Sequence, residues 1–296
     1  MRVTGYRHQR TLAAPVSVGG VGLITGKRVT ARFVPAAPHA GLTFRRTDLR
    51  APAIRALAAN VTGTQRRTTL GPPDAGVTLV EHVLAALAGL RVDNCEVELD
   101  GPEPPGMDGS AREFVRALEA AGIVKQIARR PVYAVSEPVT VRGPGATLAL
   151  HPSTEPGLSI SYRLDYGPRA PLAPQAHTLR ACPDTFARDV AACRTFVTEL
   201  EAHALRAQGI GRHLGARDLL VFGANGPIDN ELRYADEPAR HKILDLVGDL
   251  ALCGFDLAVH VVAYRSGHAL NVELARALCR AAAPNGRATR PQARAA

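Results

Sequence analysis

The segment from Asp236 to Asp249, DEPARHKILDLVGD, restricts the fold more than any other part of the chain. Glu237-Pro238 is typical of a helix entrance, because proline is tolerated in a first turn and acidic residues favour that end. Apolar residues then recur at roughly helical spacing, namely Ile243, Leu244, Val247, Leu250 and Leu252. The segment therefore predicts an amphipathic helix whose apolar stripe packs on a core.

A polar face accompanies that stripe. His241, Asp245 and Asp249 follow one another at i, i+4 and i+8 and share one side of the predicted helix. An imidazole and a carboxylate one turn apart can both bind Zn²⁺, and an acidic residue a turn further on can support them from behind. An HxxxD pair also occurs by chance in many helices, and an exposed, ion-paired face is the simpler interpretation of this pattern alone. A metal site needs a third ligand from elsewhere.

A second helix is predicted over Val77 to Leu90, where strong helix formers precede a stop at Gly89. Glu81 and His82 stand side by side in this mostly apolar segment, and burying them without partners costs several kcal/mol. Two interpretations remain open. Either a core histidine is hydrogen-bonded beside an exposed glutamate, or His82 is the third metal ligand and Glu81 takes a proton from a metal-activated water.

Length and composition point to a folded, soluble protein. The 296 residues are enough for two domains, and 46% of them are apolar. We find no apolar run long enough to span a bilayer, and the start, MRVTGYRHQRTL, lacks the apolar block of a signal peptide, so we expect a cytoplasmic protein. The five cysteines show no CxxC spacing, which argues against a disulfide framework or a thiolate zinc site.

The net charge of +9 suits a polyanionic partner such as nucleic acid, an anionic membrane surface or a phosphorylated substrate. The basic residues are dispersed, however, and aromatic residues make up 4% of the chain, too few to provide stacking platforms for bases. A nucleic-acid-binding protein is therefore the weaker alternative.

The remaining segments alternate between strand-like and helix-like patterns. Residues 8–35 predict a hairpin that turns in the glycine-rich VGGVGLITG, and RVDNCEVELDG predicts a strand with Asn94, Glu96, Glu98 and Asp100 on one face. Ser110 is expected to cap the helix AREFVRALEAAGI. After KQIARRP, three strand-like runs follow, and RSGHALN is expected to be a loop before the last helix, VELARALCRAA. We place a domain boundary near residue 128 and expect a disordered tail over 284–296.

Four motifs occur in a familiar order: VEHVLAALAGLRVDN, GMDGSA, RHKILDLVGDL and YRSGHALN. Together with QRTL, FRRTDL, TTLG and CRTF they cover nearly the whole chain, and the chain resembles the zinc-dependent UDP-3-O-acyl-N-acetylglucosamine deacetylases of lipid A synthesis. The resemblance implies two α+β domains of similar architecture, here 1–128 and 129–283, with the active site at their interface. It also implies hydrolysis of an N-acetyl group to give a free 2-amine and acetate.

The resemblance assigns a role to particular residues. The zinc ligands would be His82, His241 and Asp245. Glu81 would be the general base and His268 the general acid, with Asp249 orienting that histidine. Thr195 would stabilise the oxyanion, Phe196 would contact the substrate near an acyl-chain passage, and Lys242 would serve both catalysis and substrate binding. For partners it implies the UDP-sugar substrate, no nucleic acid, a monomer and transient contact with a membrane surface.

Two positions depart from the family pattern. Ile24 stands where the family usually has a histidine in GVGLH, and His213-Leu214-Gly215 stands where a Gly-Gly-Ser run is usual. In the family this loop shapes the acyl passage, and on that basis Gly215 is expected at the substrate. The sequence leaves the acyl-chain length open. A zinc amidohydrolase acting on a different acylated amino sugar therefore remains an alternative.

Overall fold

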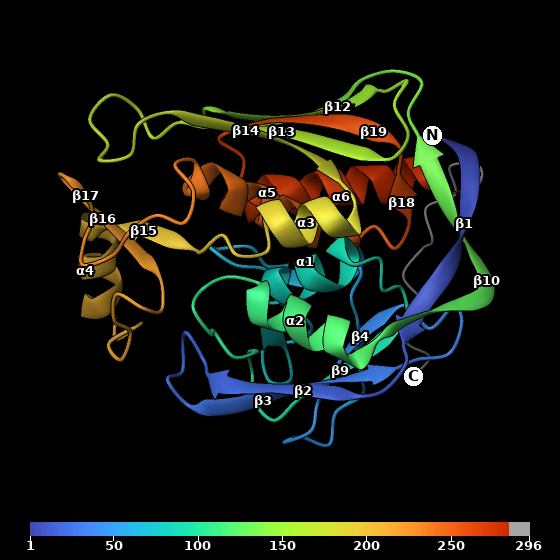
Figure 1. Ribbon diagram of the computed structural model, residues 1–296, viewed down its shortest axis with the longest axis horizontal. Helices are drawn as coiled ribbons and strands as arrows, with labels where there is room; N and C mark the ends of the chain where they lie inside the picture. Colours follow the sequence, from blue (N-terminus) through green and yellow to red (C-terminus); the bar gives the residue numbers. More distant parts are fainter. Residues whose placement is uncertain (284–296) are drawn as a thin grey trace, which may run out of the picture.

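The computed structural model describes residues 1–283 and arranges them in four layers, with a sheet on each outer side and helices between (Figure 1). This order follows because each sheet has one apolar face that must be covered. The α+β prediction is confirmed. The predicted disordered tail, 284–296, lies outside the described residues. Among the described residues no helix is long and apolar enough to cross a membrane.

The N-terminal sheet has five strands in the order β2-β3-β9-β4-β5, and two helices cover its inner face (Figure 1). Its strands are β2 (Val16–Val21), β3 (Arg28–Pro35), β9 (Cys95–Leu99), β4 (Leu42–Arg46) and β5 (Ile54–Arg55), and its helices are α1 (Glu81–Gly89) and α2 (Arg112–Ala121). All neighbouring strands are antiparallel except β4 and β9. Within β9, buried and partly exposed residues alternate as the sequence pattern predicts.

The C-terminal sheet also has five strands, in the order β11-β12-β19-β13-β14. They are β11 (Val139–Gly143), β12 (Ala146–Pro152), β19 (Val259–Tyr264), β13 (Leu158–Leu164) and β14 (Gln175–Ala181). Three helices pack beneath it: α3 (Pro183–Asp189), α5 (Glu237–Ala251) and α6 (His268–Ala282). Each half of the chain therefore contributes one sheet and the helices that cover it.

Smaller elements flank these layers. One sheet joins β1 (Arg2–Leu12), β10 (Ile123–Ala134) and β18 (Asp256–Leu257); a second joins β6 (Val61–Gly63), β7 (Thr69–Leu70) and β8 (Val77–Thr78); a third joins β15 (Phe196–Thr198), β16 (Leu220–Gly223) and β17 (Gly226–Pro227). A 3-10 turn spans Ala58–Asn60 and α4 spans Glu199–Ala207. Residue 128 falls inside β10, and the division into two domains there stays a prediction.

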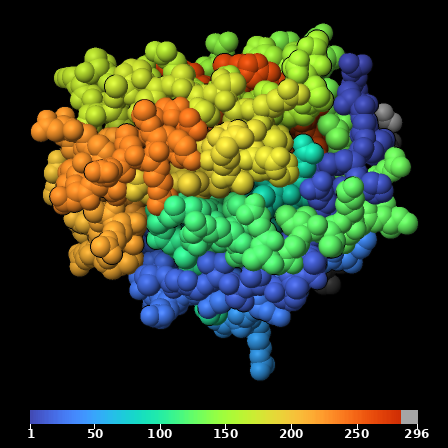
Figure 2. Space-filling model, in the orientation of Figure 1, coloured from blue at the N-terminus to red at the C-terminus, as the bar shows by residue number. Residues whose placement is uncertain are grey.

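The β1–β10 ribbon and the β15–α4–β16 segment stand at opposite sides of the molecule (Figure 1). Figure 2 shows the second of these, in gold to orange, as a flank that bridges the upper and lower halves of this face.

Several local predictions need correction. The last helix begins at His268, so HALN belongs to α6 and not to the predicted loop. The N-cap of α2 is Ala111 rather than Ser110, whose hydroxyl donates to Asp108 Oδ1 at 2.6 Å and accepts from the Arg112 backbone N–H at 3.3 Å. α1 begins at Glu81 rather than Val77, because Val77–Thr78 forms β8 and Leu79 has a φ of 57° that a helix does not continue.

The crossing of α1 and α5 depends on Gly248. A Cβ added at Gly248 would lie 2.1 Å from the carbonyl oxygen of Glu81, so only glycine permits this approach. The first turn of α1 is thereby held beside the middle of α5, and the polar residues of the two helices face one another.

Candidate metal centre

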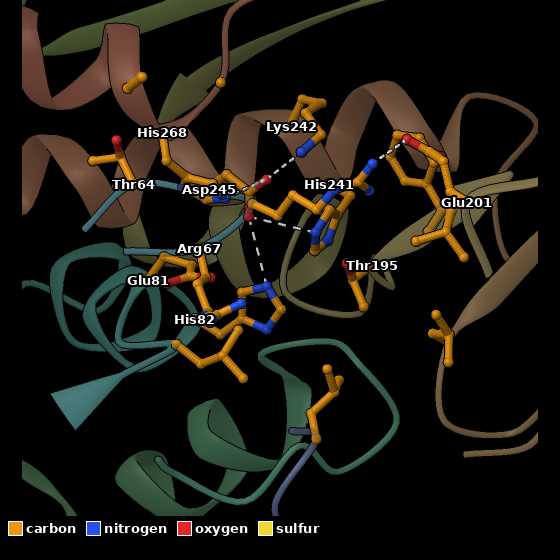
Figure 3. A pocket seen from close by; sticks show the side chains of 18 of the residues that line it. Thr64, Arg67, Glu81, His82, Thr195, Glu201, His241, Lys242, Asp245 and His268 are labelled. Atoms are coloured by element: carbon orange, nitrogen blue, oxygen red, sulfur yellow. Dashed lines mark hydrogen bonds and ion pairs between the residues drawn. The ribbon is translucent and has the colours of Figure 1, made fainter. Parts of the chain in front are cut away.

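His82, His241 and Asp245 converge between α1 and α5 (Figure 3). One side-chain ligand atom from each lies within 4.8 Å of those of the other two. Asp245 Oδ1 is 3.6 Å from Nε2 of His82 and 3.4 Å from Nε2 of His241, and the two imidazole rings are nearly perpendicular at 87°. His82, on the second predicted helix, is therefore the candidate for the third ligand that the α5 pattern requires.

The burial of these groups fits a bound cation. His241 is 2% exposed and Asp245 is 3% exposed, which overturns the interpretation as an exposed ion-paired face. Asp245 Oδ1 is buried and accepts no hydrogen bond from any residue of 1–283. An unsatisfied buried carboxylate oxygen is costly, and a metal ion would satisfy it. Two imidazole nitrogens and one carboxylate oxygen match the three-ligand set of catalytic zinc sites, which keeps one position open.

The protonation states also suit metal binding. His241 Nδ1 donates to the Cys193 carbonyl at 3.0 Å, which leaves the lone pair of Nε2 toward Asp245. Burial lowers the pKa of His241 to about 3, so the imidazole is neutral. Burial alone would raise the pKa of Asp245, but Lys242, whose Nζ is 2.6 Å from Oδ2, and His241 hold it well below its usual range. The site therefore combines a neutral donor with an anionic one.

Glu81 lies beside His82 in the first turn of α1 and lines a cavity that the three candidate ligands also line. It is 2% exposed, and its Oε2 accepts a hydrogen bond from the Thr68 backbone N–H at 2.9 Å. Burial is the largest influence on this carboxyl and raises its pKa. A carboxylate with a raised pKa accepts a proton more readily, which is what a general base requires.

His268 begins α6 and is held by Asp249. Nδ1 of the imidazole donates to Asp249 Oδ2 at 2.9 Å, while Nε2 remains available 3.9 Å from Asp245 Oδ2. Burial lowers the pKa of His268, but the carboxylates of Asp249 and Asp245 outweigh burial and raise it to about 9. The imidazole is therefore protonated at neutral pH and can donate a proton.

Thr68 and Asn271 also donate hydrogen bonds to Asp249, and the sequence does not predict either contact. Oδ1 of Asp249 accepts from the Thr68 hydroxyl at 2.6 Å, and Oδ2 also accepts from Asn271 Nδ2 at 2.9 Å. Thr68 begins the TTLG run and Asn271 ends SGHALN, so both lie inside motifs that carry the resemblance. The local pattern gives no sign of their shared partner, because Thr68 and Asp249 are 181 positions apart.

A cavity of about 850 Å³ opens from this centre. Thr195, Phe196 and Lys242 line it, and Lys242 Nζ lies 5.5 Å from the centroid of the Phe196 ring. Ile24 and Leu214 also contribute to the wall. Gly215 does not line this cavity; its backbone N–H donates to Asp218 instead, at 2.7 Å.

The wall of this cavity combines apolar and polar side chains. The β15–α4–β16 segment contributes one group of apolar side chains, which we call the apolar arm, namely Val197, Ala202, Leu205, Ile210, Leu214, Leu219 and Val221. The polar part of the wall contains the candidate metal ligands and several arginines, including Arg142 and Arg265. The cavity thus suits a ligand that has both an apolar chain and negatively charged groups.

Comparison with known proteins finds matches to a family of deacetylases. Residues 9–280 match the family model described as UDP-3-O-acyl N-acetylglycosamine deacetylase. The chain is 40% identical to the UDP-3-O-acyl-N-acetylglucosamine deacetylase of Geobacter sp. strain M21, over 90% of this chain and 87% of that protein. It is 41% identical to the enzyme of the same name from Thermosynechococcus vestitus, over 91% of this chain and 93% of that protein.

The fold, the site and these matches define the chain as a deacetylase. It belongs to the UDP-3-O-acyl N-acetylglycosamine deacetylase family. The chain is also 38% identical to the bifunctional enzyme LpxC/FabZ of Chlorobaculum tepidum, of which it spans 64% of the length.

Proposed function

We propose that this chain is a zinc-dependent hydrolase that removes the N-acetyl group from UDP-3-O-acyl-N-acetylglucosamine in lipid A biosynthesis. One observation carries the proposal: the half-buried His82 and the buried His241 and Asp245 bring their ligand atoms together, and Asp245 Oδ1 has no hydrogen-bond partner among residues 1–283. Glu81 and His268 line the same cavity. Membership of the deacetylase family supports the substrate. Cytoplasmic location, a monomeric state and transient membrane contact stay predictions.

The proposed reaction divides its proton transfers between two side chains. Zn²⁺ held by His82, His241 and Asp245 would supply a Lewis acid that activates water and polarises the amide carbonyl. Glu81 takes a proton from the attacking water, and His268 gives one to the amine as the C–N bond breaks. Asp249 keeps the His268 ring oriented through Nδ1 and stabilises its charged form.

The tetrahedral oxyanion needs stabilisation as the carbonyl is attacked. Lys242 provides a compact positive charge, and its contact with Asp245 places that charge beside the cluster. Thr195 lines the same cavity and offers a hydroxyl donor. The apolar arm formed by the β15–α4–β16 segment is where we place the 3-O-acyl chain, with Phe196 between that arm and the metal-ligating residues.

A direct assay tests this function. Purified protein should release acetate from UDP-3-O-acyl-N-acetylglucosamine, lose the activity after treatment with a chelator and recover it with added Zn²⁺. The zinc-loaded Glu81→Gln protein serves as the inactive control. Turnover of another acylated amino sugar but not of this one would favour the alternative amidohydrolase. Binding to nucleic acid that weakens steeply with salt, without any turnover, would favour the nucleic-acid alternative.

A further inference from the structure

A second cavity, of about 920 Å³, lies at the opposite ends of the two helices that carry the metal cluster. Ala88 and Gly89 at the end of α1, and Leu250 and Ala251 at the end of α5, contribute to its wall. The β1–β10 ribbon contributes one side of the wall. The residues that line this cavity and those that line the deacetylase cavity form two separate sets, so the second cavity is a different place on the molecule.

The lining of the second cavity is strongly basic. Six arginines line it, against three carboxylates: Arg2, Arg7, Arg55, Arg91, Arg129 and Arg130 against Asp93, Glu155 and Asp256. The C-terminal ends of α1 and α5 add a partial negative charge of roughly 0.5 each, which leaves the excess positive. The wall therefore attracts anions.

Part of that charge is already neutralised within the fold. Arg7 is 2.7 Å from Asp93, and Arg130 is 2.7 Å from Asp256 and 3.2 Å from Asp93. Glu155 is 3.3 Å from Arg180, which lies outside the cavity. The carboxylates of the wall are thus engaged with their own partners and do not compensate the other arginines.

The other four arginines have no such partner. They are Arg2, Arg55, Arg91 and Arg129. No hydrogen bond or ion pair joins their guanidinium groups to any residue of 1–283, including the carboxylates of the wall. Arg91 also has a φ of 58°, a backbone conformation that is uncommon outside glycine and often marks a functional position. Guanidinium groups bind phosphate through paired N–H donors, which makes them the side chains best suited to a phosphate group.

Apolar residues form the rest of the wall. Leu42, Leu57 and Val92 come from the N-terminal half, while Val247 and Leu250 come from α5. Tyr6, at the ribbon, is 61% exposed. A wall of free guanidinium groups next to aliphatic side chains matches a molecule that joins a phosphate to an apolar portion.

We propose that this second cavity binds a phosphate ester carrying an apolar group. The ligand is either a small organic phosphate in solution or the headgroup region of an anionic lipid, because both present the same chemistry. The proposal is independent of the deacetylation reaction, since the second cavity shares no lining residue with the cavity beside His82, His241 and Asp245.

Hydrogen exchange read by peptide, with octyl phosphate as the probe, locates binding. In the wild-type protein the probe should slow exchange in peptides over 1–12 and 123–134. Peptides over 196–223 report occupation of the other cavity separately. Octyl glucoside has the apolar chain without the phosphate, and inorganic phosphate has the charge without the chain, so each should protect these strands less. Vesicles of phosphatidylglycerol, compared with phosphatidylcholine, show whether the natural source is a lipid surface.

Variants decide whether the arginines hold the ligand. Arg55→Gln/Arg129→Gln should weaken the protection of 1–12 and 123–134 by about tenfold or more in apparent affinity, while Arg55→Lys/Arg129→Lys, which keeps the charge without the paired donors, should weaken it less. Arg28→Gln/Arg50→Gln removes two exposed arginines that line neither cavity and should change nothing. Equal protection in the Arg55→Gln/Arg129→Gln protein, or no protection of these strands in the wild type by either octyl phosphate or anionic vesicles, would overturn the proposal.

Discussion

Glu81 and His268 share the proton transfers in this account, so each should be indispensable by itself. Replacing Glu81 by Gln keeps the shape but removes the proton acceptor, and replacing His268 by Gln removes the donor to the leaving amine. Each variant should lose on the order of 10²-fold or more in kcat/KM. The double variant should lose less than the product of the two, since both act on one transition state. Near wild-type turnover in either zinc-loaded single variant would end that residue's assignment.

The pH dependence of kcat/KM follows from the same pair. The proposed mechanism needs protonated His268, whose pKa is raised to about 9, so kcat/KM should fall as the pH rises through about 9. It also needs ionised Glu81. Because burial raises the pKa of this carboxyl, the fall in kcat/KM on the acid side should occur at a higher pH than the ordinary pKa of a glutamate. A rate profile against pH, with the metal content checked at each pH, tests this. An alkaline limb near pH 6.5 instead would contradict a His268 that is stabilised in its protonated form by Asp249.

At the scale of residues, the sequence predicts those site residues that a pattern within one segment identifies. Helical spacing puts His241 and Asp245 on one face, and the cost of burying His82 in an apolar helix points to the missing ligand. Thr68 and Asn271 could not be predicted, because their role is to satisfy Asp249 and depends on contacts between distant segments. The resemblance predicts Gly215 at the substrate, but the sequence of this loop differs from the family pattern, and Leu214 lines the cavity instead of Gly215.

At the scale of elements, the close crossing of α1 and α5 fixes the distance between His82 on α1 and the pair His241 and Asp245 on α5. Gly248→Ala should destabilise the protein by about 1–3 kcal/mol, because the added methyl group overlaps the Glu81 carbonyl and must push α1 away. Urea denaturation measures this, and zinc affinity should fall with it. Gly5→Ala is the matched control, since a Cβ at Gly5 meets no atom within 4 Å. Equal stability of the two variants would show that the crossing tolerates a side chain.

The loop after α4 is tied to the N-terminal glycine turn. His213 Nε2 donates to the Gly22 carbonyl at 3.0 Å, and its ring lies so close to Gly26 that a Cβ there would be 2.8 Å from Nδ1. This contact joins two walls of the cavity, to which Leu23, Ile24 and Leu214 contribute. We expect it to limit the length of acyl chain that the apolar arm accepts.

Restoring Gly-Gly-Ser at 213–215 tests that expectation. Loss of the His213 contact and of the Leu214 side chain should extend activity toward longer acyl chains, while activity on a short-chain substrate stays close to wild type because no catalytic group changes. The measurement is kcat/KM across substrates of graded acyl length. His213→Gln, which keeps an N–H donor, is the control. An unchanged preference would show that this loop does not limit the chain.

Elements were predictable where one periodicity dominates. α5 follows its apolar stripe and β9 its alternation. The start of α6 could not be predicted, because RSGHALN contains a glycine and polar residues that are typical of a loop. In the structure Gly267 is the N-cap and the helix begins at His268. The 125–131 stretch lacks periodicity because β10 is a strand of a ribbon with both faces largely exposed or half-buried.

At the scale of the whole molecule, the cluster joins the two halves of the chain. His82 comes from the N-terminal half, and His241 and Asp245 come from the C-terminal half. A metal that binds only the folded protein stabilises it by mass action, by about 2.7 kcal/mol at a free concentration 100 times Kd. Adding Zn²⁺ to chelator-treated protein should therefore raise the unfolding midpoint. The Asp245→Ala variant should show no such rise, and an equal rise in that variant would place the metal elsewhere.

The central claim is that His82, His241 and Asp245 form one catalytic zinc site. Metal analysis of the purified wild-type, His82→Ala, His241→Ala, Asp245→Ala and Glu81→Gln proteins tests it most directly. Zinc should be present in equimolar amount in the wild type and in the inactive Glu81→Gln protein, and it should be lost from the three ligand variants together with acetate release. Full zinc occupancy in any correctly folded ligand variant would remove that residue from the site and contradict the account.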